Sequence, residues 1–398
     1  MALHVGVVGC GDIAIKNYLP GTKALAGTVE IVATCDTRYD RAVRAAEEFG
    51  AEECVAYATL DELLRDPRVA GVEILTPWPY HYRLALQALQ AGKHVYVQKP
   101  MCQTLEEANR LVEEANRRGL VLAAAPPNMI SPTLQRIKTL VREGVIGKVG
   151  LIYNHSSHGG ATGPGRYTDS QWFFMREAGV WTSLVDMGVY GLHTVTGILG
   201  PAKRVTAFSG IAFRDRTFVD PETQQSRLVQ ITAHDNGIVL LDWGEGTIGA
   251  VDGAFTMITR EGPGMVIYGQ KGVISATGRG GNFRLYQRDE GGRYPRGWSE
   301  VDADGNVVAE GPAAPPAQAA GPGAGPAARR EGADRGPGRG GRRDPTAPSA
   351  DIAHWAECVL QGKKPILSAE HARHVVEIME KAVIASQTGQ AQTLTTTF

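Results

Sequence analysis

The first residues whose types and spacing point to chemistry form a glycine-rich turn. Residues Gly9–Ala14 follow the pattern Gly-x-Gly-x-x-Ala, directly after the apolar segment His4–Val8 and at the start of a helical segment. Such a turn needs glycines for a tight bend and for a backbone bare enough to let a pyrophosphate approach, and a small residue where helix meets strand. We therefore expect a phosphate-bearing cofactor to lie against Gly9, Gly11, Asp12 and Ile13.

An acidic residue follows at the distance that a dinucleotide requires. Asp36 ends the next apolar segment, 25 residues after Gly11, where a carboxylate can accept hydrogen bonds from both hydroxyls of an adenine ribose. Its charge would repel a 2′-phosphate, which favours NAD over NADP, although Arg38 could pair with that phosphate. The alternative for Asp36 is a turn at the end of a strand. Together with the glycine turn, it indicates NAD as cofactor.

Polar residues also follow two later β-branched segments, Gly71–Leu75 and His94–Val97. Ligands of open α/β sheets bind at the carboxyl ends of the strands, so these positions are candidates for cofactor contact. One of them, His81, has an alternative as an ordinary residue in the first turn of a helix. The candidate cofactor-binding residues at these strand ends are Thr76, Pro77, His81, Gln98 and Lys99.

The elements that must position these residues alternate between short β-branched segments and segments of helical period. This alternation predicts a doubly wound parallel α/β sheet, a Rossmann domain, over residues 1–125. A capping box, Thr104 with Glu107, marks the start of one helix. Strands are expected at His4–Val8, Glu30–Cys35, Gly71–Leu75, His94–Val97 and Val121–Ala124, and helices at Asp40–Phe49, Leu60–Arg65, His81–Ala91 and Leu105–Arg118.

Residues 126–398 differ in pattern, with longer segments of alternating apolar and polar residues joined by glycine-containing turns. This pattern predicts an α+β domain with a large, mostly antiparallel open sheet. Helices are expected at Thr133–Glu143, Leu184–Leu199 and Ala350–Ser386. Within this domain, residues 311–348 contain no aromatic or branched aliphatic side chain, so we expect a disordered insertion there. Strands are expected at Val149–His155, Arg204–Phe213, Arg227–His234, Ile238–Trp243, Gly249–Ile258, Gly264–Tyr268 and Gly272–Ala276.

Composition excludes several other classes of protein. The 41 basic and 42 acidic residues leave a formal charge of -1, which disfavours nucleic acid and anionic membranes as partners. The spacing of the five cysteines is not typical of disulfide pairing, so no disulfides are expected. The histidines form no convincing metal triad with a carboxylate, so no metal is expected. The N-terminus lacks a basic leader and a cleavage site, which predicts a cytoplasmic protein.

In their order along the chain, several motifs resemble those of the Gfo/Idh/MocA oxidoreductase family, which includes glucose–fructose oxidoreductase and inositol dehydrogenase. The resemblance covers both halves of the chain and leaves only 311–348 wholly outside it. It implies an NAD-dependent enzyme that transfers a hydride to or from a hydroxyl carbon of a sugar, inositol or related polyol. The motifs are Gly9–Ala14, Asp36, Thr76-Pro77 with His81, Ala91–Val95 before Lys99-Pro100, Ile146–Val149, Asp186–His193, and Gly269 with Gly272–Ile274.

The resemblance also implies roles for individual residues. Lys99 and Tyr190 would handle the hydroxyl proton, Asp186 would bind and orient the sugar hydroxyls, and His193 would be a second relay or a substrate ligand, with a buried structural histidine as the alternative. Asp186 and Tyr190 stand at i and i+4, on one face of a helix. Candidate substrate-binding residues are Asn128, His155, Trp172, Asp186, Tyr190 and His193.

Two departures from the family pattern bear on the substrate. Gln98 stands where the family usually has glutamate, and Val180–Thr182 replaces a common run of three glycines, which adds bulk expected near the substrate. The alternative functions are an NAD-dependent glycoside hydrolase and a non-catalytic NAD-sensing regulator; Lys99, Asp186 and Tyr190 argue against the regulator. By resemblance, the open sheet would form a homodimer or homotetramer.

Overall fold

The computed structural model describes residues 2–160, 170–220, 223–258, 262–278, 280–310 and 349–398. The segment 311–348, for which the sequence predicts an insertion, lies outside the described residues. Within the described part of the chain, no helix is both long and apolar enough to cross a membrane.

The N-terminal residues form a six-stranded parallel sheet in the order β3-β2-β1-β4-β5-β6, as the sequence predicts. Both faces of this sheet are covered, so its strands are nearly continuous runs of apolar residues. The sequence missed only β3, a strand of three residues that is partly exposed. The strands are β1 Leu3–Val8, β2 Val29–Cys35, β3 Val55–Tyr57, β4 Gly71–Ile74, β5 His94–Val97 and β6 Leu122–Ala124.

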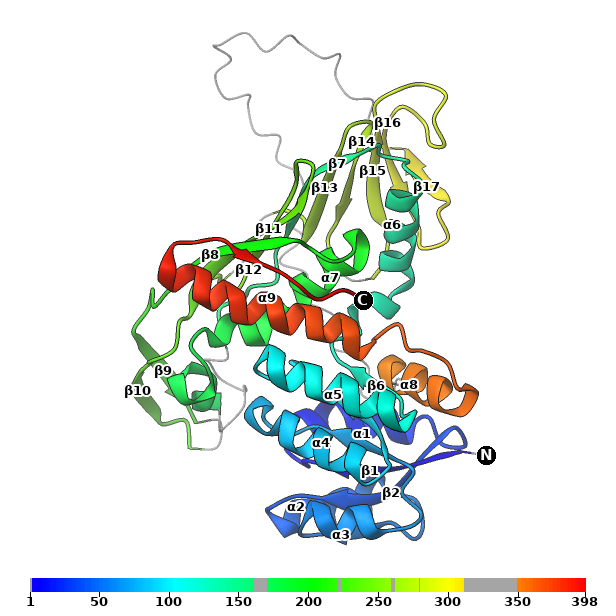
Figure 1. The fold of residues 1–398 in the computed structure, drawn as a ribbon, viewed down its shortest axis with the longest axis vertical. Coiled ribbons are helices and arrows are strands. Elements are labelled where there is room, and N and C mark those ends of the chain that lie inside the picture. Colours follow the sequence, from blue (N-terminus) through cyan, green and yellow to red (C-terminus); the bar gives the residue numbers. More distant parts are fainter. Residues whose placement is uncertain (1, 161–169, 221–222, 259–261, 279, 311–348) are drawn as a thin grey trace.

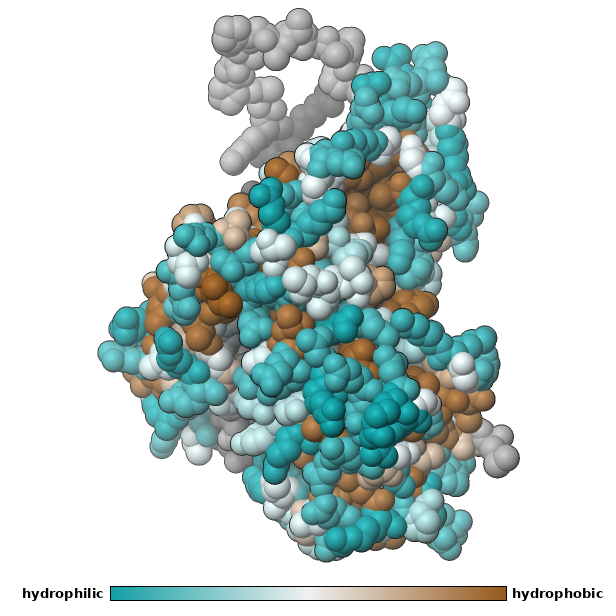
Figure 2. Space-filling view, viewed as in Figure 1, coloured by the Kyte–Doolittle hydropathy of each residue, from teal (hydrophilic) through white to brown (hydrophobic). Residues whose placement is uncertain are grey.

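Helices cover both faces of this sheet, and all but α1 agree with the expected segments. The predicted capping box is present: Thr104 Oγ1 accepts from the Glu107 amide, and Glu107 accepts from the Thr104 amide. Hydrophilic side chains gather over α4 and α5 on the face shown in Figure 2. The helices are α1 Leu19–Lys23, α2 Tyr39–Phe49, α3 Leu60–Arg65, α4 His81–Gln90 and α5 Leu105–Arg118.

The second sheet has ten strands in the order β17-β16-β15-β14-β13-β7-β12-β11-β8-β18, and only β7 and β12 pair in parallel. The sequence missed β9, β15, β16, β17 and β18. These strands have at most five residues each, which is too short for a period to stand out in the sequence, and β17 is also exposed along its whole length. The strands are β7 Val149–Asn154, β8 Arg204–Gly210, β11 Asn236–Gly244, β12 Thr247–Asp252, β13 Met265–Gly269, β14 Gly272–Ala276, β15 Phe283–Gln287, β16 Gly297–Val301, β17 Val307–Glu310 and β18 Gln392–Thr393; β9 Asp215–Val219 and β10 Ser226–Gln230 form a separate hairpin.

One face of the ten-stranded sheet packs on helices, and no helix of the described residues covers the other face, which we call the open face. Strand pairing places Phe208 opposite Ile238, and Leu240 opposite Ala250, on that open face. Phe208 is 74% exposed and lies near the edge of the sheet, where β18 pairs only with the start of β8. The exposed apolar residues of this face are Tyr153, Phe208, Ile238, Leu240, Ile248 and Tyr268, and we refer to them as the open-face patch.

The predicted helix Ala350–Ser386 is wrong in one respect, because the structure has two helices there. Gly362 ends α8 (Ala350–Gln361) in the left-handed conformation, and Ser368 begins α9 (Ala369–Thr388) by accepting a hydrogen bond from the His371 amide. The remaining long helices of the second half are α6 (Pro132–Arg142) and α7 (Val189–Leu199).

Helix α8 packs into the core of the N-terminal sheet although it lies far along the chain (Figure 1). The Trp355 ring is fully buried and occupies the space beside Gly71, where a Cβ atom would lie 2.8 Å from the indole. Ile352 and Ala356 join the same apolar cluster. We therefore propose that the N-terminal domain comprises residues 2–125 together with α8, rather than 1–125 alone.

A group of buried polar residues joins α8 to this domain. Asp351 accepts hydrogen bonds from the hydroxyls of Tyr18, at 3.0 Å, and Tyr96, at 2.6 Å. Glu73 on β4 is fully buried nearby and accepts from Thr22 Oγ1. Burial, with the charge of Asp351, raises the pKa of Glu73 to about 8.

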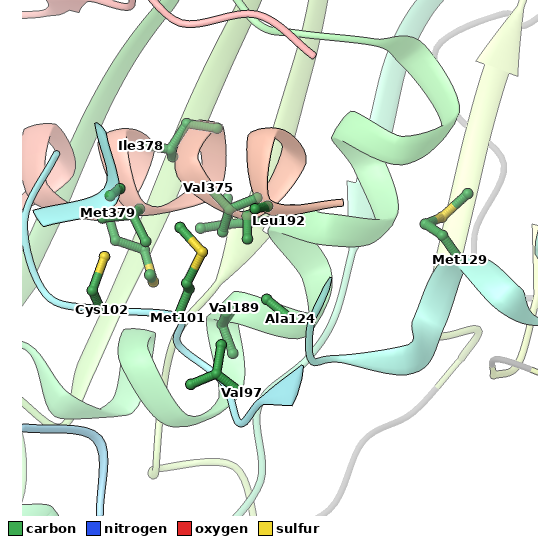
Figure 3. Packing of buried hydrophobic residues seen from close by; sticks show 14 of the residues in the cluster. Val97, Met101, Cys102, Ala124, Met129, Val189, Leu192, Val375, Ile378 and Met379 are labelled. Atoms are coloured by element: carbon green, nitrogen blue, oxygen red, sulfur yellow. The ribbon is translucent and has the colours of Figure 1, made fainter. Parts of the chain in front are cut away.

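A single apolar cluster runs from the N-terminal sheet into the second half of the chain (Figure 3). Val97 at the end of β5 lies close to Val189 of α7, and Met101 lies between them and α9. This packing fixes the end of β5 against the start of α7. Lys99, two residues after Val97, therefore faces the Asp186–Tyr190 segment.

Candidate active site

The glycine turn is shaped as its sequence predicts. Gly9 has φ +93°, which favours glycine, and a Cβ there would lie 2.8 Å from Thr76 Cγ2 and 2.9 Å from the Thr76 amide nitrogen. A Cβ on Gly11 would meet a single atom within 4 Å, Arg41 Nη1 at 3.9 Å, so this part of the turn is open to a ligand. Thr76 Oγ1 is buried beside the turn without a hydrogen-bond partner among the described residues. These features fit a bound pyrophosphate.

Asp36 lies at the end of β2 and also shapes the turn. Its Oδ2 accepts from the Cys10 amide at 2.8 Å and its Oδ1 from the Arg38 amide at 2.9 Å. A carboxylate oxygen has two lone pairs, so each oxygen can accept one further bond from a ribose hydroxyl. The side chains of two neighbouring candidates pair at the surface: Asp12 with Lys16 at 2.9 Å, and Arg38 with Asp40 at 3.7 Å.

His81 is buried and joins two strand-end loops. Its Nδ1 lies 2.7 Å from the Pro100 carbonyl oxygen and its Nε2 lies 2.8 Å from the Thr76 carbonyl oxygen. Burial lowers the pKa of His81. The side chain thus holds the loop of Thr76 and Pro77 against the loop of Lys99, and its effect on a cofactor would be one of positioning.

Lys99, Asp186 and Tyr190 lie together between the two halves of the chain. Lys99 Nζ is 2.5 Å from Asp186 Oδ1 and 3.0 Å from the Asp186 carbonyl oxygen, and it lies 5.4 Å from the centre of the Tyr190 ring. Asp186 belongs to a π-helical turn, Leu184–Gly188, which precedes α7. A second π-helical turn, Ala14–Tyr18, follows the glycine turn. Such turns are frequent at functional sites.

Asn128 supports Tyr190 through the backbone. Its buried Nδ2 donates to the Tyr190 carbonyl oxygen and to Thr194 Oγ1, both at 2.8 Å. Both amide hydrogens are therefore used to hold α7. The sequence places Asn128 among the substrate-binding residues, and the structure adds that it positions the helix that bears Tyr190.

His193 lies on α7 with its ring 4.7 Å from that of His371 on α9. The side chain is buried, and the loss of water, together with the charge of His374 when protonated, lowers the pKa of His193 to about 3. No hydrogen bond joins it to Lys99 or Tyr190 among the described residues. These contacts favour the structural alternative, and the role of a relay stays a prediction.

The other two candidates, His155 and Trp172, contact partners other than Lys99, Asp186 and Tyr190. His155 Nδ1 is 2.6 Å from Asp252 Oδ2, at the ends of β7 and β12. Trp172 stacks on Phe173 at 4.1 Å and lies 4.4 Å from Trp78, which follows Pro77. Trp172 thereby joins the second half of the chain to the carboxyl edge of the N-terminal sheet.

Trp181, the largest side chain of the segment Val180–Thr182, is buried in the core, contrary to the expectation that it adds bulk near the substrate. Trp181 is buried in the second domain, where its Nε1 donates to the Gly253 carbonyl oxygen at 2.8 Å. A Cβ at Gly237 would lie 2.3 Å from the indole, so the absence of a side chain there makes room for the ring. The tryptophan is thus part of the core beneath α7.

A cavity of about 480 Å³ opens beside Tyr190. It lies between the π-helical turn after the glycine turn, the end of β5 and the start of α6. Sequence reasoning missed Asn17, Tyr18 and Ser131, because their positions face the cavity only once α6 and α8 pack on the first domain. The polar residues that line it are Asn17, Tyr18, Gln98, Asn128, Ser131 and Tyr190. Within the described residues, no cluster of three or more possible metal ligands is present.

Comparison with known proteins agrees with this geometry. A family model described as an oxidoreductase family with an NAD-binding Rossmann fold matches residues 3–125, and one described as the GFO/IDH/MocA C-terminal domain matches residues 134–275. The chain belongs to the Gfo/Idh/MocA oxidoreductase family. The resemblance deduced from the sequence is thus confirmed, and the protein is an oxidoreductase with an NAD-binding domain.

Relatives in the Gfo/Idh/MocA family include named enzymes. An uncharacterized oxidoreductase of Synechocystis sp. is 30% identical over 284 residues, which are 68% of this chain and 71% of that protein. D-glucoside 3-dehydrogenase of Escherichia coli is 29% identical over 52% of this chain and 57% of the enzyme. Myo-inositol 2-dehydrogenase of Thermotoga maritima is 24% identical over 69% of this chain and 75% of the enzyme.

Solved structures share the whole fold. An NAD-binding oxidoreductase from Klebsiella pneumoniae superposes with a TM-score of 0.76 at 18% identity, over 99% of this chain and 100% of that one. Levoglucosan dehydrogenase in complex with NADH and levoglucosan gives 0.75 at 17% identity over 99% and 100% of the chains. At these identities the likeness concerns the fold.

Replacing Asp36 with alanine is expected to weaken NAD binding and to narrow the preference for NAD over NADP. Each lost hydrogen bond from a ribose hydroxyl to the carboxylate contributes at most about 1.5–3 kcal/mol. Titration of the protein with each cofactor measures the effect. Asp40→Ala, which removes a carboxylate paired with Arg38 at the surface, is the control and should bind NAD normally. Tighter binding of NADP than NAD by the unmodified protein would contradict the assignment.

Proposed function

We propose that the protein oxidises or reduces a hydroxyl-bearing carbon of a sugar, inositol or related polyol with NAD as cofactor. The observation that supports this most is the grouping of Lys99 Nζ with Asp186 Oδ1 at 2.5 Å and with the Tyr190 ring at 5.4 Å. It lies beside a cavity of about 480 Å³, large enough for a monosaccharide. The names of the E. coli and T. maritima relatives agree with such a substrate.

The roles we propose follow from the atoms that each side chain presents. Oxidation removes the hydroxyl proton of the substrate, and Tyr190, with the Lys99 ammonium beside its ring, is the group we assign to take it. Asp186 would accept hydrogen bonds from substrate hydroxyls while Lys99 fixes its carboxylate. NAD, when bound, would supply the acceptor for the hydride that leaves the carbon bearing this hydroxyl. Asn128 keeps Tyr190 in place through the backbone of α7.

A panel of sugars and polyols, followed by NADH absorbance with and without added NAD, tests this proposal. Net reduction of NAD by a member of the panel is expected. Cleavage of a glycoside without net reduction would instead indicate a hydrolase, and NAD binding without any reaction would indicate a regulator.

We also propose that the protein forms a homodimer or homotetramer through the open-face patch, in a reducing compartment such as the cytoplasm. The patch consists of six large apolar side chains on one sheet face, more than a monomer usually exposes together. The five cysteines have no spacing typical of disulfide pairing, which supports a reducing compartment.

The double substitution Phe208→Asp and Tyr268→Asp is expected to dissociate this oligomer, because two charges would be buried in an apolar interface. Light scattering coupled to gel filtration measures the mass. Leu360→Asp, at an exposed position on α8 away from the sheet, is the matched control and should leave the mass unchanged. A monomeric unmodified protein at micromolar concentration would contradict the proposal.

A further inference from the structure

The order of strands in the first sheet determines which loops a bound dinucleotide passes. The glycine turn follows β1, the loop Thr76–His81 follows β4, and Lys99 follows β5; these three strands are neighbours in the order β1-β4-β5. A pyrophosphate at the glycine turn and a reacting end near Lys99 therefore place the cofactor across the end of β4. The loop Thr76–His81 lies at the middle of that path.

Trp78, in this loop, joins the two halves of the chain. It is 3% exposed, and its Nε1 donates to the Ala178 carbonyl oxygen at 2.7 Å. Its ring lies 4.4 Å from that of Trp172 and 5.1 Å from that of Phe173. Gln103, in the loop after β5, donates to the same Ala178 oxygen at 3.2 Å, so both lone pairs of this oxygen are used. We refer to these five residues as the clasp.

The first half of the chain holds its side of the clasp in place. Thr76 lies against the glycine turn, where a Cβ on Gly9 would come within 2.8 Å of Thr76 Cγ2. The His81 ring lies 2.8 Å from the Thr76 carbonyl oxygen and 2.7 Å from the Pro100 carbonyl oxygen, which ties this loop to the loop after β5. Because Trp78 stands in a loop held at both ends, the clasp opens only if the second half moves its side away.

The second half carries its side of the clasp on a small body with its own apolar core. The Phe174 carbonyl oxygen accepts from the Ala233 amide at 3.0 Å, beside the hairpin of β9 and β10. The Phe174 ring packs on Phe218 of β9, and this cluster is separate from the main apolar cluster, which crosses between the halves beside β5 and α7. Opening on the clasp side therefore leaves the main core intact, whereas opening beside β5 and α7 would break it.

We propose that the clasp is a gate for the cofactor, and that NAD enters and leaves the crevice only when Trp78 separates from Trp172 and Ala178. The contact consists of groups of this chain alone, so it forms both with and without cofactor. A contact of equal strength in the two states controls the rates of exchange and leaves the affinity for cofactor unchanged. The gate requires the binding of NAD but not the proposed reaction on a sugar or polyol.

Stopped-flow measurement of NADH fluorescence tests the gate. Association is followed after mixing of protein with NADH, and dissociation after a chase of the complex with excess NAD. Trp78→Phe keeps an apolar ring but lacks the indole N–H, so both rate constants should rise by the same factor of about two to ten, which corresponds to the loss of one hydrogen bond. The dissociation constant from isothermal titration should stay unchanged.

Three further variants make this result specific to the clasp. Trp172→Ala removes a half-buried ring from the other side of the clasp, and both rate constants should rise together by about tenfold. Trp243→Phe is the matched control, because it loses an indole hydrogen bond of 2.8 Å to the Gly200 carbonyl oxygen within the second half, and neither rate should change. Asp36→Ala removes a direct contact with the cofactor, so it should raise the dissociation rate and the dissociation constant together.

The outcomes distinguish the gate from the proposed function. Unchanged rates in both Trp78→Phe and Trp172→Ala overturn the gate and leave the function standing. A faster dissociation with an equal rise in the dissociation constant and unchanged association also overturns the gate, because Trp78 would then be an ordinary contact of the cofactor. A joint rise of both rates at constant affinity supports the gate, even if no sugar or polyol of the panel reacts.

Discussion

Replacing Lys99 with methionine should lower turnover by about 10²–10⁴, the usual contribution of a positioned acid–base group. The ammonium lies beside the Tyr190 ring and holds the Asp186 carboxylate, so its loss removes the charge from the proton-handling pair and frees Asp186 to move. Steady-state kinetics on the substrate found in the panel measures the effect. Cofactor binding should survive, because the glycine turn and Asp36 lie at the other end of a dinucleotide.

Tyr190→Phe should reduce turnover by a similar factor while it keeps the ring over Lys99. Melting temperature should change little, because only a hydroxyl group is removed. The matched control for lysine is Lys363→Met, at an exposed position just after the end of α8, where the side chain pairs with Glu357. Full activity of Lys99→Met with NAD still bound would contradict the assigned chemistry.

Glu73→Gln should raise the free energy of unfolding at pH 8 by about 2–5 kcal/mol and change it little at pH 5. The pKa of Glu73 is raised to about 8 in the folded chain by burial and by the charge of Asp351. The unfolded chain releases this proton near pH 4.5, so between pH 4.5 and 8 the folded state binds more protons. The contribution of Glu73 to the free energy of unfolding therefore falls as pH rises from 4.5 to 8. Glutamine keeps the shape and does not ionise.

Denaturant unfolding at the two pH values measures this difference. The buried histidines act in the opposite direction, because their lowered pKa values make stability fall as pH drops below about 6.5. Their contribution cancels when variant and unmodified protein are compared at the same pH. Glu47→Gln, an exposed carboxylate, should change stability by less than about 0.5 kcal/mol at either pH. An equal difference at pH 5 and pH 8 would contradict the buried-carboxyl assignment.

The sequence predicted best what local chemistry determines. The glycine turn is recognisable because Gly9 needs both a positive φ and a bare Cα against Thr76. The strands of the first sheet are recognisable because burial on both faces demands continuous apolar runs. The family resemblance assigned Lys99, Asp186 and Tyr190 to one site but did not predict the ion pair of Lys99 with Asp186. The packing of Val97 against Val189 brings the two segments together.

Residues whose role depends on a distant partner could not be predicted. Trp181 was expected near the substrate, but it enters the core because Gly237, on another strand, leaves space for its ring. Nothing near Asp351 in the sequence indicates that it accepts hydrogen bonds from Tyr18 and Tyr96. Gln98 was assigned to the cofactor from its position after β5. That Gln98 also lines the cavity beside Tyr190 became visible only in the structure.

The place of α8 has a consequence for the order in which the chain can fold. During synthesis the six strands of the first sheet emerge early. The face of the sheet at Gly71 nevertheless stays exposed to water until Trp355 has been synthesised. The hydroxyls of Tyr18 and Tyr96 likewise lack their carboxylate acceptor until Asp351 has been synthesised. The nucleotide-binding half of the protein therefore matures only after nearly the whole chain has left the ribosome, and a fragment that ends at residue 125 would present an apolar surface to water.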